Sequence, residues 1–199
     1  MNAVVFSPPK EEITDLSFLE YFQSDRPVEI EIGCGKGRFL FSRAERCPEI
    51  NFLGFDRVSK WMKRKSRRSE KEGVRNLKFV KAEAREVLKQ HVPSGRVSVF
   101  YVYFPDPWPK RRHNRRRLIN REFLSLLYDR LTPGGRIQVA TDDPDYFLHI
   151  KTAAESGAIT WTGTHESLNQ KLGDWSEKTN YELKFEAQKK NIFYLELTK

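Results

Sequence analysis

Glycines at every second position mark a loop suited to a nucleotide-like ligand. Gly33, Gly35 and Gly37 follow the strand-like run Val28–Ile32 and open a helix-like stretch. Glycine lets the backbone turn tightly and approach a ligand closely, and the N-terminus of the following helix offers free N–H groups. A dinucleotide-binding fingerprint would require glycine at position 38, where this chain has Arg38, so the loop disfavours a nicotinamide oxidoreductase.

Acidic residues at the ends of three successive strand-like runs favour S-adenosylmethionine (SAM) as the ligand. Glu31 stands two residues before the loop, Asp56 ends a run about 20 residues beyond it, and Glu83 follows the next run. SAM carries an ammonium group and a ribose diol that carboxylates can bind. We expect Glu31 to take that role, Asp56 to accept from the ribose hydroxyls and Glu83 to contact the adenine end. The simpler alternative for each acid is a helix cap or a solvated turn.

A proline-rich segment follows the fourth strand-like run, Val97–Phe104. Its sequence, Pro105-Asp-Pro-Trp-Pro109, fixes φ at three of five positions and removes three backbone donors, so it must be a rigid loop. Rigidity would hold Asp106 and Trp108 in place at an active site. The alternative is a stiff connection in which Trp108 serves as a hydrophobic plug.

The charge balance points to a nucleic-acid partner. The 199 residues include 36 Lys and Arg against 27 Asp and Glu, a net charge of +9. Such a surplus attracts polyanions. Nine basic residues lie between Arg57 and Arg75, and six of the eight residues Lys110–Arg117 are basic. We expect both segments to contact RNA; the alternative for the first is a solvated helix face.

The arrangement of elements predicts one α/β domain over residues 1–199, with a short N-terminal segment at 1–27. Strand-like runs alternate with helix-like stretches, which calls for a Rossmann-like, mostly parallel sheet with helices on both faces. The expected strands are Val28–Ile32, Phe52–Asp56, Leu77–Ala82, Val97–Phe104 and Arg136–Thr141. The expected helices are Arg38–Arg46, Ser59–Glu72, Ala84–Gln90, Asn120–Leu131 and Asp145–Glu155. Thr162–Lys178 is expected to be a surface loop, and Tyr181–Ala187 with Ile192–Leu197 an antiparallel C-terminal hairpin.

Other classes of protein fit the composition less well. The longest apolar run is far shorter than the roughly 20 residues that cross a bilayer, and the first residues lack the features of a secretory signal, so we expect a cytoplasmic protein without a membrane partner. Two cysteines and four scattered histidines give no metal-ligand pattern, and Cys34 is expected to be a small packing residue. The sequence is compatible with a monomer and with a homodimer.

These motifs, taken in order over Val28 to Leu197, resemble the bacterial tRNA (guanine-N7)-methyltransferases, a family of class I SAM-dependent enzymes. The resemblance rests on Glu31 with the glycine loop, Asp56, Pro-Asp-Pro-Trp-Pro-Lys, the stretch Arg112–Arg117, Thr141-Asp142 and Thr179–Glu182. It implies methylation of guanine N7 in the variable loop of tRNA. It also implies that Glu31, Asp56, Glu83 and Asp106 contact SAM and that Asp106 is the catalytic residue. The implied substrate and RNA contacts are Lys110, Arg112, His113, Asn114, Arg115, Arg116, Arg117, Asp142, Thr179, Asn180, Tyr181 and Glu182.

The chain departs from the family pattern in three places. Asp56 stands where Glu is common, Glu83 stands where Asp or Asn is expected, and the segment before Val28 is shorter than the basic arms of many members. We therefore expect other basic segments to contribute part of the binding to tRNA.

The chemistry of guanine limits what the enzyme must do. Because N7 carries a lone pair at neutral pH, no general base is needed. Orientation can contribute on the order of 7–11 kcal/mol, and a nearby carboxylate can stabilise the guanine as it becomes cationic. Asp106 would hold and polarise the base.

Two other interpretations of the sequence stay open. One is a methyltransferase for another RNA or for protein, and the other is a non-catalytic basic RNA-binding domain on the same fold.

Overall fold

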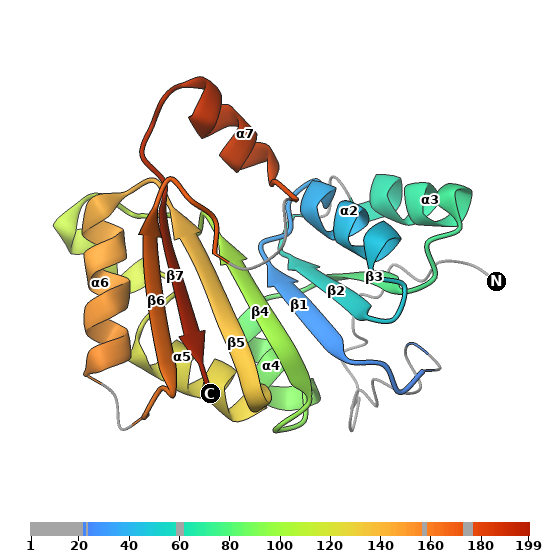
Figure 1. Ribbon diagram of the computed structural model, residues 1–199, viewed down its shortest axis with the longest axis horizontal. Helices are drawn as coiled ribbons and strands as arrows, with labels where there is room; N and C mark the ends of the chain where they lie inside the picture. The colour runs from blue at the N-terminus through green and yellow to red at the C-terminus, as the bar shows by residue number, and fades with distance from the viewer. Residues whose placement is uncertain (1–21, 23, 59–61, 157–158, 173–176) are drawn as a thin grey trace.

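The computed structural model describes residues 22, 24–58, 62–156, 159–172 and 177–199, and a seven-stranded sheet forms its centre (Figure 1). The strand order is β3-β2-β1-β4-β5-β7-β6. The strands are β1 Val28–Ile32, β2 Asn51–Asp56, β3 Leu77–Lys81, β4 Val97–Tyr103, β5 Leu131–Thr141, β6 Gly163–Leu168 and β7 Phe193–Thr198. Strands β1 to β5 pair in parallel, whereas β7 pairs antiparallel with both β5 and β6. The predicted mostly parallel α/β sheet with an antiparallel C-terminal pair is confirmed.

Two hydrophobic layers lie on opposite faces of the sheet. Side chains alternate along a strand, so Val28, Ile30 and Ile32 of β1 join the layer that includes residues of α4, α5 and α6. The opposite layer includes residues of α2, the β4 tyrosines and Phe185 of α7. The helices are α2 Arg38–Arg46, α3 Met62–Glu72, α4 Ala84–His91, α5 Arg121–Arg130, α6 Pro144–Glu155 and α7 Asn180–Ala187, with a 3₁₀ helix, η2, at Arg111–Arg116. Helices on both faces were predicted, and this prediction is confirmed.

Polar side chains cap the start of several of these helices. The side chain of Asp143 accepts from the Tyr146 N–H at 2.8 Å at the start of α6, and Asn120 accepts from the Phe123 N–H at the start of α5. Such caps satisfy backbone donors that have no partner within the helix. Ser59, the predicted start of the helix that corresponds to α3, lies outside the described residues, as does most of the N-terminal segment 1–27.

The predicted partner strand of the C-terminal hairpin is wrong. Tyr181–Ala187 does not form a strand but belongs to α7, and β7 pairs instead with β6, which lies inside the segment predicted to be a loop. Thr179 and Glu182 form a capping box, in which each side chain accepts from the other residue's backbone N–H. This Thr-x-x-Glu spacing is a helix-start signal that outweighs the apparent alternation of Tyr181, Leu183 and Phe185.

None of the helices in the described ranges is long and apolar enough to span a bilayer.

Candidate cofactor and substrate site

Five acidic residues gather at one edge of the sheet because five parallel strands end there. Strands β3, β2, β1, β4 and β5 are neighbours, so residues at their carboxyl ends share that edge. The acids at or directly after these ends are Glu83, Asp56, Glu31, Asp106 and Asp142. Helix α7 lies above the same edge (Figure 1). The topology thus gathers acids that are up to 111 positions apart in the chain, since 142 − 31 = 111.

The glycine loop adopts a backbone shape that requires glycine. Gly33, Gly35 and Gly37 have φ values of +81°, +48° and +74°, in the left-handed region that side chains disfavour. The N–H groups of Gly33 and Cys34 donate to the Phe55 carbonyl oxygen at 2.9 and 3.0 Å, which fixes the loop against the end of β2. A Cβ at Gly33 would meet nothing within 4 Å. Within the described residues, the space beside Gly33 is therefore open to a ligand.

Asp56 holds the loop from the neighbouring strand. Its Oδ2 accepts from the Gly35 N–H at 2.7 Å and its Oδ1 from the Val58 N–H at 2.8 Å. An ionised carboxylate offers about four lone-pair positions, so two remain for ligand donors. Asp56 can therefore shape the loop and still accept from ribose hydroxyls.

The two acids of β1 are both buried, yet only Glu29 has a hydrogen-bond partner at each carboxylate oxygen. Glu29 accepts from Arg43 Nη2 at 3.1 Å and from the Tyr101 hydroxyl at 2.7 Å, so it is a structural ion pair. Glu31 is 4% exposed, and its Oε2 has no hydrogen-bond partner in the described part of the chain. An unsatisfied buried oxygen is costly unless a ligand satisfies it. Glu31 therefore fits a cationic or hydrogen-donating group of SAM.

Burial changes the acidity of Glu31. Desolvation raises the pKa of its carboxyl group to about 8, although the positive charges of Lys171 and Lys65 oppose the shift. Sequence reasoning missed both lysines: Lys65 lies in the basic segment that was expected to contact RNA, and Lys171 lies in a segment that was expected to be a surface loop. Lys65 of α3 is 2% exposed and donates to Cys34 Sγ at 3.2 Å. Cys34 is buried, and burial raises the pKa of its thiol to about 12, so it remains a neutral packing residue as predicted.

The loop after β4 places Asp106 at the surface of this edge. Phe104 and Trp108 flank it with left-handed φ values of 53° and 46°, and the Phe104 N–H donates to the Ala140 carbonyl oxygen at 2.7 Å. Asp106 is exposed and makes no hydrogen bond with the described residues. Its carboxylate is therefore free to meet a substrate.

Arg117 is the one buried residue of the predicted RNA-binding stretch Lys110–Arg117. Its side chain is only 2% exposed, and its Nε donates to the Pro107 carbonyl oxygen at 2.9 Å while Nη2 pairs with Asp145 at 2.5 Å. The guanidinium also lies 4.9 Å from the centre of the Tyr146 ring. Arg117 thus ties the proline-rich loop to α6, and its contact with RNA stays a prediction.

The remaining basic residues of this stretch stay accessible. None of the η2 residues is buried, and Lys110, Arg112, Arg115 and Arg116 are exposed, whereas His113 and Asn114 are half-buried. The Arg116 guanidinium lies 4.9 Å from the centre of the Trp108 ring, and His113 meets that ring edge-on. Trp108 therefore anchors the basic stretch beside Asp106.

Two of the predicted substrate residues, Thr179 and Glu182, hold the start of α7. The Thr179 hydroxyl oxygen accepts from the Glu182 N–H, and Glu182, 1% exposed, accepts from Thr179 N–H, Tyr194 and Lys171. Thr179 and Glu182 thus hold the start of α7 in place, and their contact with substrate stays a prediction. Asn180 and Tyr181 are exposed, and the Tyr181 ring lies 5.8 Å from that of Phe104.

The last two acids also have partners. Asp142 pairs with Lys190 Nζ at 3.0 Å, so this contact must yield if Asp142 binds substrate. Glu83 caps α4 by accepting from the Glu86 N–H at 3.2 Å, as the simpler alternative expected. Its contact with adenine stays a prediction. Within the described ranges no group of three or more His, Cys, Asp and Glu side chains could hold a metal ion.

Comparison with known proteins identifies the family. Residues 25–195 match the family described as "Putative methyltransferase". The chain is 34% identical to the tRNA (guanine-N(7)-)-methyltransferase of Rubrobacter xylanophilus over 95% of this chain and 84% of that protein. It is 32% identical to the enzyme of the same name from Geobacter metallireducens, over 100% and 94%.

Solved structures share the fold. The crystal structure of the 16S rRNA methyltransferase KamB matches with a TM-score of 0.68 at 18% identity, covering 100% of this chain and 99% of that one. A 16S rRNA (adenine(1408)-N(1))-methyltransferase from Catenulisporales acidiphilia, crystallised with SAM, matches with a TM-score of 0.62 at 16% identity, covering 100% and 97%. With a methyltransferase fold, a carboxylate edge suited to SAM and these relatives, the chain belongs to the family of tRNA (guanine-N7)-methyltransferases.

Proposed function

We propose that the acids at the carboxyl ends of the strands and the basic residues that follow the proline-rich loop act in one reaction. This reaction is the transfer of a methyl group from SAM to N7 of a guanine in the variable loop of tRNA. The observation that carries the assignment of the site is the unsatisfied, buried oxygen of Glu31 beside the left-handed glycine loop. The relatives named as tRNA (guanine-N(7)-)-methyltransferases support the substrate.

Glu31, Asp56 and the backbone of Gly33, Gly35 and Gly37 would hold the cofactor. When bound, SAM supplies an electrophilic methyl group on a positively charged sulfur. Glu31 would satisfy its free oxygen with a donor or cationic group of SAM, and Asp56 would use the lone pairs that the Gly35 and Val58 N–H groups leave free.

Asp106 would orient the guanine and stabilise its positive charge. Guanine N7 needs no deprotonation, so the carboxylate serves as a fixed acceptor and counter-charge. Its rigid loop supports this role, because Arg117 anchors Pro107 and the left-handed Phe104 and Trp108 flank the acid. Exposed Tyr181 beside Phe104 offers an aromatic surface from α7 at the same edge.

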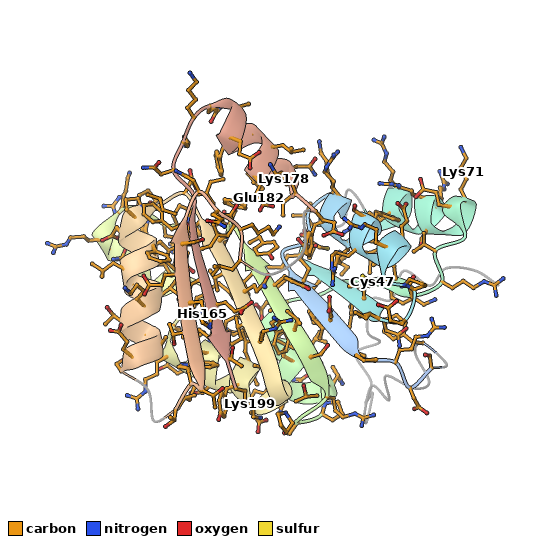
Figure 2. All side chains as sticks on the ribbon, viewed as in Figure 1. Cys47, Lys71, His165, Lys178, Glu182 and Lys199 are labelled. Atoms are coloured by element: carbon orange, nitrogen blue, oxygen red, sulfur yellow. The ribbon has the colours of Figure 1, made fainter. Side chains whose placement is uncertain are left out.

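The exposed residues Lys110, Arg112, Arg115 and Arg116 would bind tRNA phosphates. Arginine forks match phosphate geometry, and Trp108 fixes Arg116 beside the site. The basic side chains of α3 would extend this surface, because Arg64, Arg67 and Lys71 are exposed; Figure 2 shows Lys71 at the outer end of that helix. We propose that this reaction takes place in the cytoplasm and that a single domain carries it out.

The direct test is to incubate the purified protein with labelled SAM and unmodified bulk tRNA, digest the product and identify the labelled nucleoside. We expect label in 7-methylguanosine. Label in another nucleoside would overturn the proposed target, and an absence of SAM binding in calorimetry would overturn the proposed cofactor site.

A further inference from the structure

Lys171 is a nearly buried cation that joins three parts of the molecule. It lies between β6 and α7, and its side chain is 12% exposed. Its ammonium group lies 4.7 Å from the centre of the Phe39 ring on α2 and 4.6 Å from that of Tyr103 on β4. A buried lysine that is not paired would be neutral or destabilising, so its partners define its role.

Those partners hold the start of α7. Lys171 Nζ donates to the Glu177 carbonyl oxygen at 2.6 Å and to Glu182 at 3.0 and 3.2 Å. Glu182 in turn completes the capping box with Thr179 and accepts from the Tyr194 hydroxyl at 3.0 Å. Figure 2 shows Glu182 where α7 begins, above the carboxyl ends of the strands. One ammonium group therefore fixes both ends of the segment 177–182.

The same ammonium group acts on the cofactor carboxylate. Lys171 provides the largest favourable charge interaction with Glu31. The other charged groups that face Glu31 are Lys65 from α3, Glu182 from α7 and Asp56 from the end of β2. Removing Lys171 leaves two acids and one lysine around Glu31.

We propose that Lys171 is a positioning residue that couples the two halves of the site: it holds α7 over the substrate side and keeps Glu31 ready to bind SAM. This inference rests on the proposed function. Lys171 takes no part in methyl transfer itself. It acts through Glu182 and Glu31, and its effect must therefore appear in binding as well as in turnover.

The test replaces Lys171 with methionine, which keeps the length of the side chain and removes the charge, and measures SAM binding by calorimetry across pH. An opposite charge typically shifts a carboxyl pKa by about 1–3 units. Loss of the Lys171 charge should therefore weaken SAM binding roughly tenfold or more near neutral pH. The difference in affinity between variant and wild type should shrink as pH rises above the pKa of Glu31. The ratio of variant to wild-type affinity cancels the titration of SAM itself. A purely structural lysine would lower thermal stability and leave this pH profile unchanged, which would overturn the proposal.

Lys178→Met is the matched control. Lys178 stands just before α7 and pairs with Glu186 of that helix at 2.8 Å, but both side chains are exposed, 45% and 42%. This variant should keep the wild-type SAM affinity and pH profile. Glu182→Gln added to Lys171→Met should recover thermal stability, because it removes the buried charge left unpaired. It should recover SAM affinity only in part, because the negative charge of Glu182 raises the pKa of Glu31 less than Lys171 lowers it. Full recovery of both would overturn the direct effect on Glu31, because Lys171 would then act through Glu182 alone.

Hydrogen exchange on the wild-type protein tests the coupling even where the variants fold poorly. Adding SAM should slow exchange of the backbone amides at 180–187, and unchanged exchange there would overturn the coupling. If the wild-type protein fails to bind SAM, the proposed cofactor site is wrong. If it binds SAM and Lys171→Met binds equally well at all pH values, only the coupling is wrong.

Discussion

The buried carboxylate of Glu31 makes the stability of the ligand-free protein depend on pH. Burial raises the pKa of Glu31 from 4.5 to about 8, so the folded state binds this proton more tightly than the unfolded state does. The stability that this proton contributes is complete when the pH is below the pKa of Glu31 in the unfolded state. It is lost as the pH rises through the pKa of Glu31 in the folded state. At 1.36 kcal/mol per pKa unit, the total is about 5 kcal/mol, and roughly half of it, about 2–3 kcal/mol, disappears between about pH 5.5 and pH 7.5.

Glu31→Gln removes this titration and keeps the shape of the side chain. We expect urea unfolding of the ligand-free variant to show a smaller loss of stability than the wild type over that pH interval, with a difference of about 2–3 kcal/mol. SAM should bind the variant roughly 10–100-fold more weakly, since a hydrogen bond to a charged group contributes about 1.5–3 kcal/mol.

Glu166→Gln provides the control, because Glu166 is exposed and pairs with Lys151 far from the glycine loop. Its pH dependence of stability should follow that of the wild type. Identical pH dependence in wild type and Glu31→Gln would refute the argument from burial. Wild-type SAM affinity in the variant would refute the assignment of the free oxygen to the cofactor.

Three further substitutions test the rest of the site. Asp106→Ala should abolish methylation while tRNA binding, measured by filter retention, stays near wild type; loss of both together would contradict the proposed division of labour. Replacing Arg112, Arg115 and Arg116 with Gln should weaken tRNA binding and lower the slope of log affinity against log salt by up to about 3, whereas an unchanged slope would place the phosphate contacts elsewhere. Arg117→Met should reduce stability by about 1–3 kcal/mol in urea unfolding, because it leaves the Pro107 carbonyl without its donor. It should also lower kcat more than it weakens tRNA binding. Weaker tRNA binding at unchanged stability would instead support Arg117 as an RNA contact.

Local signals in the sequence were enough to predict the framework of the fold. The apolar runs Val28–Ile32 and Val97–Tyr103 form strands because alternating side chains fill a hydrophobic layer on each face of the sheet. The glycine loop follows from the left-handed φ values that glycine permits, and the three prolines fix the loop that carries Asp106. Parallel strands then bring the acids at their carboxyl ends to one edge.

Alternation alone misassigned the last part of the chain. Tyr181, Leu183 and Phe185 suggested a strand, but the capping box at Thr179 and Glu182 starts a helix there. The strand β6 contains Gly163, Thr164, His165 and other mostly exposed residues, and pairs along one edge with β7. An edge strand with few buried side chains has little hydrophobic pattern to reveal it.

By itself, the sequence determined which residue types stand at strand ends and loops, because these depend on local backbone chemistry. Only the tertiary structure decided which charges are buried and which have partners. Glu29 and Glu31 are two positions apart on one strand, yet Arg43 and Tyr101 satisfy only the first. Arg117 is buried while Arg116 is exposed, and Lys171 reaches Glu182 and the surroundings of Glu31. Burial and pairing depend on contacts between residues far apart in the chain, and these contacts are settled when the helices pack on the sheet.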